Sequence, residues 1–251
     1  MKIVGCPSEW RAPPALPLGA TSVHVWRISL RVGDPAALLP FLSPDEAVRA
    51  SRFIFERDAN AFIIAHATLR RILAEYLSVV PQSLAFITGP FGKPAISGPP
   101  DAGGLEFNLS HSGDLALVAV SRGSPLGVDI ERLDARIEHL ELAEQFFSPA
   151  ERAALRSLPA DEARTQGFFN AWTRKEAYLK ATGHGITRGL HHFDVTLAPS
   201  EPAALLADRL DPLAVRRWRM AALSPGAGYA AAIVVASDVD EIAIYDARLA
   251  A

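Results

Sequence analysis

The stretch Gly127-Val128-Asp129-Ile130-Glu131 is the one around which the rest of the chain can be interpreted. Two aliphatic residues alternate with two carboxylates, and this period of two predicts a strand with both acids on one face. Two carboxylates this close repel each other unless a cation lies between them. A hard cation such as Mg²⁺ takes one or two carboxylates and completes its shell with water and phosphate oxygens. A solvated edge strand would give the same pattern, so other parts of the chain have to decide.

Composition narrows the class of protein. The chain has 251 residues, which allows one large domain or two small ones, and a hydrophobic content of 49% is enough for a core. A net charge of −3 and a pI near 6.2 give no electrostatic case for nucleic-acid binding. The single cysteine, Cys6, excludes an intrachain disulfide and a metal site of the cysteine type. Because there is neither a signal peptide nor a run of about 18 apolar residues, we expect a soluble, cytoplasmic protein without a membrane span.

The first half predicts a mixture of strands and helices. Ser43 and Glu46 form a capping box around a helix start with proline at the first helical position. A longer helix follows Asp58 and stops at Pro81. Period-two patterns and turn residues predict strands at 23–31, 84–88, 105–109 and 115–121, the last two joined by a turn over 110–114. Residues 1–20 are proline-rich and are expected to form an irregular arm.

The second half repeats the same signals. Ser148 and Glu151 form another capping box, and a long helix is predicted from Asp161 to Thr182 with Gly183 as its C-cap glycine. Further strands are predicted at 193–197, 216–223, 229–236 and 242–245, whereas 198–214 gives no firm assignment. The turn-rich stretch 121–125 is the best boundary, so we divide the chain into 1–122 and 123–251.

A shift of 105 residues brings three features of the two halves into coincidence. The matches are Val23–Trp26 with Val128–Glu131, Phe41–Glu46 with Phe146–Glu151, and Ala67–Arg71 with Trp172–Glu176. Three matches at one offset, in the order strand, capped helix and long helix, predict an α+β fold of two similar halves about a pseudo-twofold axis. A ligand cleft between the halves is then expected. His24, Trp26 and Arg71 stand opposite the acids of the second half, so one metal site is predicted.

The segment Trp172-Thr173-Arg174-Lys175-Glu176-Ala177-Tyr178-Leu179-Lys180 lies on the second long helix. Trp172, Glu176 and Lys180 are four residues apart and therefore share a face. Taken singly, such a tryptophan is usually a core residue and such a Glu–Lys pair a surface ion pair. Their spacing from Asp129 gives them a second interpretation.

Gly127-Val128-Asp129, then 42 residues, then Trp172–Lys180 resembles the signature of the 4′-phosphopantetheinyl transferases. Phe91-Gly92-Lys93-Pro94 and Phe107-Asn108-Leu109-Ser110-His111-Ser112 resemble two further motifs of that family. Two repeated halves in one chain are similar to the Sfp-type branch and unlike the short trimeric holo-acyl-carrier-protein synthases. The resemblance covers roughly Phe41 to Phe193.

The resemblance implies a reaction and a metal site. The family moves the phosphopantetheine arm of coenzyme A onto a serine of an apo acyl or peptidyl carrier protein and releases 3′,5′-ADP. By resemblance, Asp129, Glu131 and Glu176 hold Mg²⁺, or Mn²⁺, against the diphosphate of coenzyme A. Glu176 is the candidate base for the carrier serine, directly or through a water, and Lys180 stabilises the diphosphate or the departing oxygen. Phosphoryl transfer needs such positioning and charge neutralisation.

The resemblance also implies a grip on coenzyme A. Ser110 and His111 match the position that contacts the 3′-phosphate, and Lys93 matches another phosphate contact. Arg49 and Arg52 lie where the family places basic residues. Glu46 departs from the pattern, because close relatives often carry lysine there, and it shifts the expected basic contact towards Arg49.

Two other functions remain open at this point. One is a Mg²⁺-dependent phosphohydrolase of a nucleotide diphosphate, which needs an activated water and no protein acceptor. The other is a non-catalytic module that binds coenzyme A or a carrier. Because the repeat supplies within one chain what a symmetric dimer would build, a monomer is expected. Fatty-acid, polyketide and nonribosomal-peptide carriers all remain possible partners.

Overall fold

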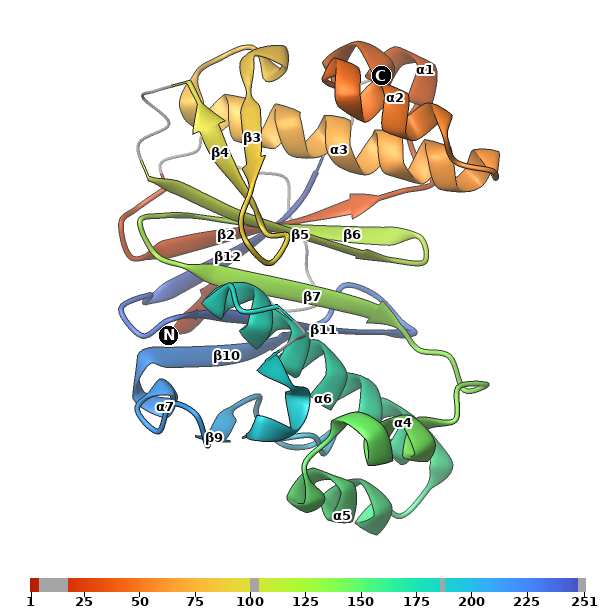
Figure 1. The fold of residues 1–251 in the computed structure, drawn as a ribbon, viewed down its shortest axis with the longest axis vertical. Coiled ribbons are helices and arrows are strands. Elements are labelled where there is room, and N and C mark those ends of the chain that lie inside the picture. Colours follow the sequence, from red (N-terminus) through yellow and green to blue (C-terminus); the bar gives the residue numbers. More distant parts are fainter. Residues whose placement is uncertain (5–17, 100–103, 186–187, 248–251) are drawn as a thin grey trace.

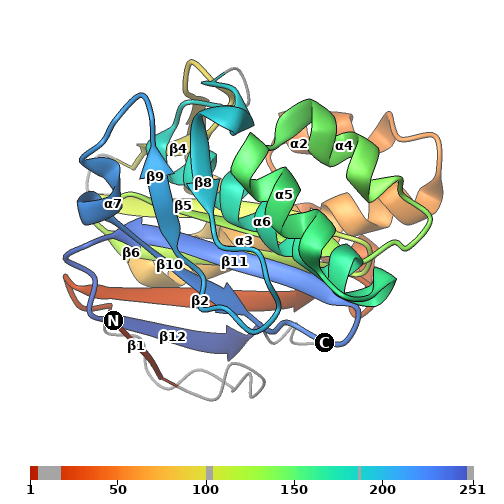
Figure 2. The same ribbon diagram turned by 90° about the horizontal axis from the view of Figure 1, so that it is seen from below.

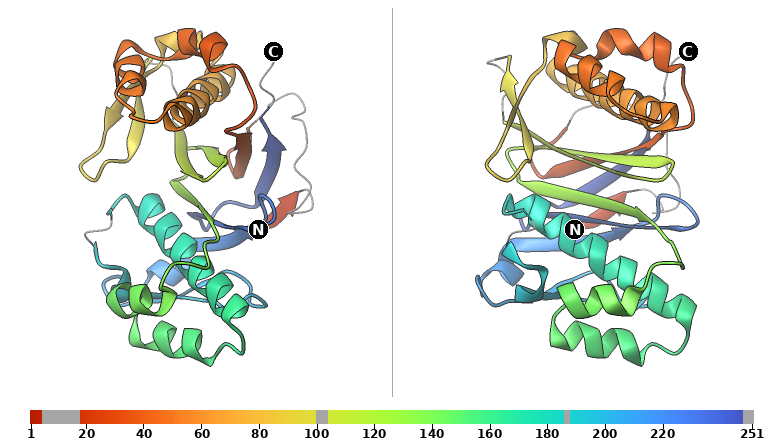
Figure 3. Two further views of the ribbon diagram at one scale, coloured as in Figure 1. Left: turned by 90° about the vertical axis from the view of Figure 1, so that its right-hand side faces the viewer. Right: turned by 45° about the vertical axis from the view of Figure 1, so that its right-hand side comes forward.

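The computed structural model describes residues 1–4, 18–99, 104–185 and 188–247, and all structural statements below refer to them. Cys6 and most of the proline-rich arm lie outside these residues. The chain forms four layers, in the order helices, sheet, sheet, helices (Figure 1). The same order of layers is visible from the side (Figure 3). The α+β class with two similar halves is therefore confirmed.

The elements agree closely with the predicted order. The strands are β1 Lys2–Val4, β2 Ser22–Ser29, β3 Ala85–Thr88, β4 Pro94–Gly98, β5 Leu105–Ser112, β6 Leu115–Arg122, β7 Leu126–Arg132, β8 Phe193–Val195, β9 Leu205–Asp208, β10 Trp218–Leu223, β11 Tyr229–Ala236 and β12 Glu241–Asp246. The α-helices are α1 Pro35–Leu38, α2 Pro44–Ser51, α3 Glu56–Leu77, α4 His139–Phe146, α5 Pro149–Ser157, α6 Asp161–Thr182 and α7 Ala214–Arg217. Short 3₁₀ helices cover Leu39–Phe41, Pro81–Ser83 and Leu190–His192.

The strands form two main sheets. The first has the order β1-β12-β2-β6-β5, with β12 parallel to both of its neighbours and the other pairs antiparallel. The second is antiparallel, with the order β10-β11-β7. The last strand of the chain, β12, thus returns to the sheet built by the first half. The division at residue 122 stays a prediction for the elements before it.

The repeat extends to strand register. Val25 of β2 pairs with Ala119 of β6, and 105 residues later Ile130 of β7 pairs with Ala231 of β11. The helices α2 and α3 pack on the first sheet, as α5 and α6 pack on the second (Figure 2). The two halves therefore share their element order, their pairing and their helix-covered faces.

Three apolar clusters hold the layers together. One lies between α3 and the first sheet, and includes Trp26 and Phe107. A second lies between α6 and the second sheet, and includes Tyr178. The third fills the space between the two sheets, with Val128 and Ile130 among its members. Each sheet is therefore buried on both faces, which explains why its central strands read as nearly continuous apolar runs.

The longest helices, α3 and α6, have 22 residues each, a length that could cross a bilayer. Both carry charged side chains along their length. No helix in the described ranges is both long and apolar enough for a membrane span.

Helix ends were predicted well, and one turn was wrong. Both capping boxes are formed, at Ser43 and at Ser148. The helix α6 has the predicted bounds, and Gly183 ends it with a φ of 69°. The predicted turn over 110–114 is incorrect, because β5 stays paired with β6 as far as Ser112. Gly113 and Asp114 alone make the turn.

Candidate functional site

The two acids of β7 lie on the face predicted from the sequence. Val128 and Ile130 are 0% exposed and point between the sheets. Asp129 points the other way, towards α6, and is 3% exposed. Glu176 and Lys180, one turn apart on α6, come from the neighbouring layer. The strand and the helix signature, 42 residues apart in sequence, are therefore adjacent in space.

Gly127 allows α6 to approach this closely. A Cβ atom built on Gly127 would lie 2.2 Å from the carbonyl oxygen of Ala177 and 2.4 Å from the amide nitrogen of Ala181. Both atoms belong to the backbone of α6, so a side chain could be accommodated only by moving the helix. The glycine of the motif thus sets the distance between the acids of β7 and the side chains of α6.

Asp129 is the centre of a polar cluster. Its Oδ1 lies 2.5 Å from the Lys180 ammonium and accepts a 2.7 Å hydrogen bond from the Ser110 hydroxyl. Lys180 also donates to the Ser110 oxygen, at 3.0 Å, and to the Val128 carbonyl, at 3.3 Å. The predicted residues Ser110, Asp129 and Lys180 are thus in direct contact.

Polar side chains of β5 bridge the two halves. β5 lies beside β7, but the two belong to different sheets. Asn108 Oδ1 accepts from the Val128 amide at 2.9 Å. The Ser112 hydroxyl donates to Glu131 Oε2 at 2.7 Å and accepts from the Arg132 amide at 3.0 Å. These side chains replace the backbone ladder that a continuous sheet would have, and Ser112 fixes the Glu131 carboxylate.

The carboxylates affect one another. Burial and the charges of Asp129 and Glu131 raise the pKa of Glu176, and Lys180 opposes this. Burial and the charge of Asp129 raise the pKa of Glu131, against the hydrogen bond from Ser112. Asp129 Oδ2 and Glu176 Oε1 are both buried without a hydrogen-bond partner. Unpartnered buried carboxylate oxygens are costly, so this cluster is suited to accept a further cation.

No three His, Cys, Asp or Glu side chains of the described ranges form a ready-made metal-ligand group. The assignment of Asp129, Glu131 and Glu176 as metal ligands therefore stays a prediction. Its structural support is the two unpartnered oxygens and the mutual repulsion of the acids.

The predicted basic residues come from the first half. Lys93, in the turn before β4, donates to the carbonyl of Leu126 at 2.9 Å, beside the start of β7. Burial lowers its pKa, although Glu106 opposes this. Lys93 is therefore held next to the acidic cluster.

His111 lies on the opposite face of β5 from Ser110 and Ser112, towards α2 and α3. Enclosure by the protein, and then the positive charges of His66, Lys180 and Arg49, lower its pKa, although part of its surface stays exposed. Arg49 also lies over the ring of Phe62, with its guanidinium carbon 5.1 Å from the ring centroid. His111 therefore has several cationic neighbours, which is the environment expected of an anion site.

Arg52 is exposed at the C-terminal end of α2, and the described residues show no contact between it and the other predicted site residues. Trp172 packs against Phe146 and Phe168, so it is at least partly a core residue. Glu46 points inwards, where it accepts hydrogen bonds from Ser43, His66 and Arg70. Despite burial, these bonds lower the pKa of Glu46 to about 2.

Lys175, inside the helix signature, is a buried structural residue. It is 0% exposed, and its ammonium lies 2.8 Å from Glu151 Oε1. It also donates to the carbonyls of Leu190 and Phe193, at 2.8 and 2.5 Å. The first half has the same arrangement 105 residues earlier, where Arg70 pairs with Glu46 at 2.6 Å. In each half, the pair ties the long helix to the capping box of the preceding short helix.

Sequence reasoning left Asn108, Ser112 and His66 without a role. Asn108, Ser110 and Ser112 alternate along β5, so a period-two pattern continued past residue 109 would have placed them on one face. The turn-forming composition of this segment concealed that pattern. His66 lies on a helix face, and no local signal distinguished it.

Comparison with known proteins agrees with this geometry. Residues 125–234 match the model of the 4′-phosphopantetheinyl transferase superfamily, and residues 33–123 match that of the 4′-phosphopantetheinyl transferase N-terminal region. The chain is 41% identical over 229 residues to the 4′-phosphopantetheinyl transferase HetI of Nostoc sp., covering 89% of this chain and 92% of HetI. It is 30% identical over 183 residues to the 4′-phosphopantetheinyl transferase Sfp of Bacillus subtilis, covering 72% and 79% of the two chains.

The two-half fold and the acidic cluster between β7 and α6 thus define a transferase that modifies carrier proteins. The chain belongs to the 4′-phosphopantetheinyl transferase superfamily. A more distant relative, the L-aminoadipate-semialdehyde dehydrogenase-phosphopantetheinyl transferase of Xenopus laevis, is 29% identical over 165 residues, covering 63% of this chain and 55% of that protein.

Proposed function

We propose that the protein transfers the 4′-phosphopantetheine arm of coenzyme A to a serine of an apo acyl or peptidyl carrier protein, with Mg²⁺, and releases 3′,5′-ADP. The serine oxygen forms a bond to the phosphorus that carries pantetheine. The bond from that phosphorus to the departing 3′,5′-ADP oxygen breaks. The observation that carries the proposal is the acidic cluster of Asp129 and Glu176, with its two buried, unpartnered oxygens, beside Lys180.

Asp129, Glu131 and Glu176 would hold the cation. When bound, Mg²⁺ or Mn²⁺ neutralises charge on the diphosphate oxygens. Ser110 and Ser112 hold two of these carboxylates by hydrogen bonds of 2.7 Å each. Because the serines are on β5 and the acids on β7, both halves contribute to the arrangement.

Glu176 is the proposed base for the carrier serine. A general base works best when its pKa lies near the working pH, and the pKa of Glu176 is raised in that direction. Lys180 would stabilise the diphosphate or the departing oxygen, and its present contact with Asp129 holds the ammonium near the reaction site.

The coenzyme A phosphates would lie against the first half. His111, with Arg49 nearby, is proposed for the 3′-phosphate, Lys93 for a second phosphate contact, and Arg52 for a more peripheral one. Ser110, through its bonds to Asp129 and Lys180, would connect this region to the reaction centre. The partner is an apo carrier protein, and the active form proposed is a monomer in the cytoplasm.

The test is incubation with coenzyme A, Mg²⁺ and a panel of apo carriers, followed by mass spectrometry. We expect a carrier mass gain of one phosphopantetheine and an equal amount of 3′,5′-ADP. The variant Glu176→Gln, which keeps the shape of the side chain, is the matched control and should give neither product. Release of ADP without any carrier would instead indicate a phosphohydrolase, and the absence of both products would indicate a binding module.

A further inference from the structure

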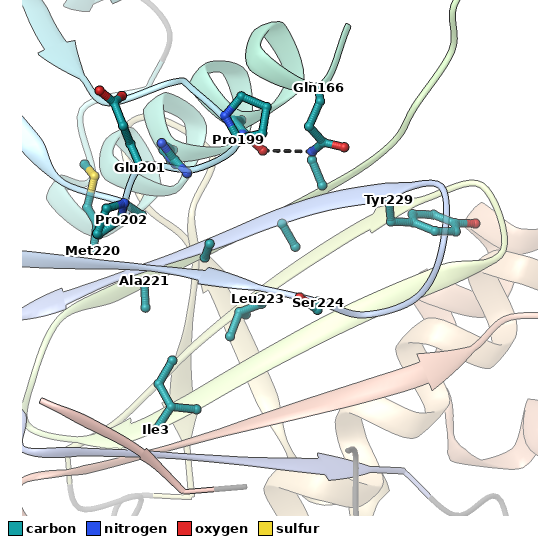
Figure 4. Close-up of a pocket in the computed structure, with 16 residues that line it drawn as sticks. Ile3, Gln166, Pro199, Glu201, Pro202, Met220, Ala221, Leu223, Ser224 and Tyr229 are labelled. Carbon is teal, nitrogen blue, oxygen red and sulfur yellow. Dashed lines mark hydrogen bonds between the residues drawn. The ribbon is translucent and has the colours of Figure 1, made fainter. Parts of the chain in front are cut away.

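A second concave site lies on the side of α6 that faces away from the acidic cluster. The cavity has a volume of about 600 Å³, and α6, the segment 199–203 and strands β10 and β11 form its walls (Figure 4). β10 is the open edge of its sheet. None of the residues predicted for the transfer reaction lines this cavity. Among those that do are Gln166, Asn170, Arg174, Glu201, Met220 and Leu223.

α6 presents two different polar stripes. Residues 172, 176 and 180 face the acidic cluster, whereas 166, 170 and 174 line the cavity. With 3.6 residues per turn, positions 174 and 176 differ by about 200° around the helix axis, so the two stripes lie on nearly opposite sides. The cavity is therefore a separate site and not an extension of the first.

Arg174 is the charged group of this cavity. It is 2% exposed, and its Nη1 donates to the Thr196 carbonyl at 2.5 Å and to the Thr196 hydroxyl at 3.0 Å. Within the described ranges, no carboxylate lies within ion-pair distance of it, and Nε and Nη2 have no hydrogen-bond partner. These two nitrogens are also not among the completely enclosed unpartnered atoms, so they reach the cavity.

The repeat shows that the fold does not need a charge at this position. The equivalent residue of the first half, 105 positions earlier, is Leu69, which is 4% exposed and belongs to the core. Burial lowers the pKa of Arg174 to about 10, which still leaves it charged at neutral pH. A buried charge without a counter-ion is costly, so an anionic ligand would supply what the described residues do not.

We propose that this cavity binds a small organic carboxylate, held by the Nε–Nη2 edge of Arg174. That edge presents two parallel N–H groups, which match the two oxygens of a carboxylate. The Gln166 and Asn170 side chains, bonded to each other at 2.9 Å, supply further polar groups, and Met220 and Leu223 face the apolar part of the ligand. The Glu201 carboxylate on the same cavity disfavours a dianion such as phosphate.

The test is titration of the full-length protein with hexanoate, followed by calorimetry and by ligand-observed NMR. Hexan-1-ol and inorganic phosphate serve as comparison probes. We expect saturable binding of hexanoate, with weaker binding of phosphate and none of the alcohol. Absence of saturable hexanoate binding, or tighter binding of phosphate, would overturn the proposal.

Two variants locate the site. Arg174→Leu installs the residue found at the equivalent position of the first half, and should weaken hexanoate binding at least tenfold. The matched control Arg57→Leu changes an arginine whose side chain is 85% exposed and should bind like wild type. Ala222→Trp fills the cavity from an exposed position and should also abolish binding, which decides the question if Arg174→Leu fails to fold. Wild-type affinity in any folded cavity variant would contradict the location.

Discussion

The variant Lys175→Met tests whether neighbouring residues of the helix signature have different roles. Lys175 is 0% exposed and its ammonium contacts Glu151 and two backbone carbonyls, so it cannot reach a substrate. Burial lowers its pKa, and Glu151 is the main group that opposes this. Removing one partner of a buried ion pair costs about 3–5 kcal/mol, because the other charge stays buried. Glu151 keeps hydrogen bonds from the Ser148 and Val195 amides, so we expect a value near the lower limit.

The measurement is the free energy of unfolding from urea denaturation, together with transfer activity well below the unfolding temperature. Lys175→Met should lose stability, while its folded fraction keeps activity within about tenfold of wild type, a change of about 1.4 kcal/mol in the barrier. The double variant Lys175→Met/Glu151→Gln should recover most of the stability, because neither charge is then left alone. Arg70→Met is the matched comparison in the first half and should be destabilised in the same way, since it leaves Glu46 unpaired. Wild-type stability with a large loss of activity in Lys175→Met would refute the structural role.

Asp129→Ala should reduce transfer at saturating Mg²⁺ by much more than tenfold, with the circular dichroism spectrum unchanged; a smaller loss would remove it from the proposed metal site. His111→Ala should raise the KM for coenzyme A by roughly ten- to a hundredfold and change kcat far less, because a charge-assisted hydrogen bond contributes about 1.5–3 kcal/mol. Dephospho-coenzyme A should be used about equally by both proteins, and an unchanged preference between the two coenzymes would argue for a purely structural histidine. Glu46→Gln should be less stable than wild type near neutral pH. Because the folded pKa of Glu46 is lowered from 4.5 to about 2, the difference in unfolding free energy should shrink as the pH falls through that interval, and a difference that grows would contradict the assignment. Gly127→Ala should lower the melting temperature strongly, since its Cβ would meet the backbone of α6, whereas Gly226→Ala, whose Cβ would make only an ordinary 3.7 Å contact, should not.

Local features were determined by the sequence itself. The capping boxes at Ser43 and Ser148, the end of α6 at Gly183 and the alternation along β7 all appear in the structure as predicted. Each of these features depends on residues within one or two turns of one another, so the pattern is complete in a short window of sequence. The repeat at 105 residues extended this to the fold, because two copies of one local order predict two similar halves.

Contacts between layers were decided only by the tertiary structure. Nothing local distinguishes Lys175, which is buried against Glu151, from Lys180, which contacts Asp129. The bond between Ser112 and Glu131 joins strands of different sheets, and the turn-like composition around it pointed the other way. Arg174 differs from Leu69 only by its environment in the second half. Such contacts depend on how α6, β5 and β7 pack against each other, and packing of distant segments leaves no period or cap in the sequence.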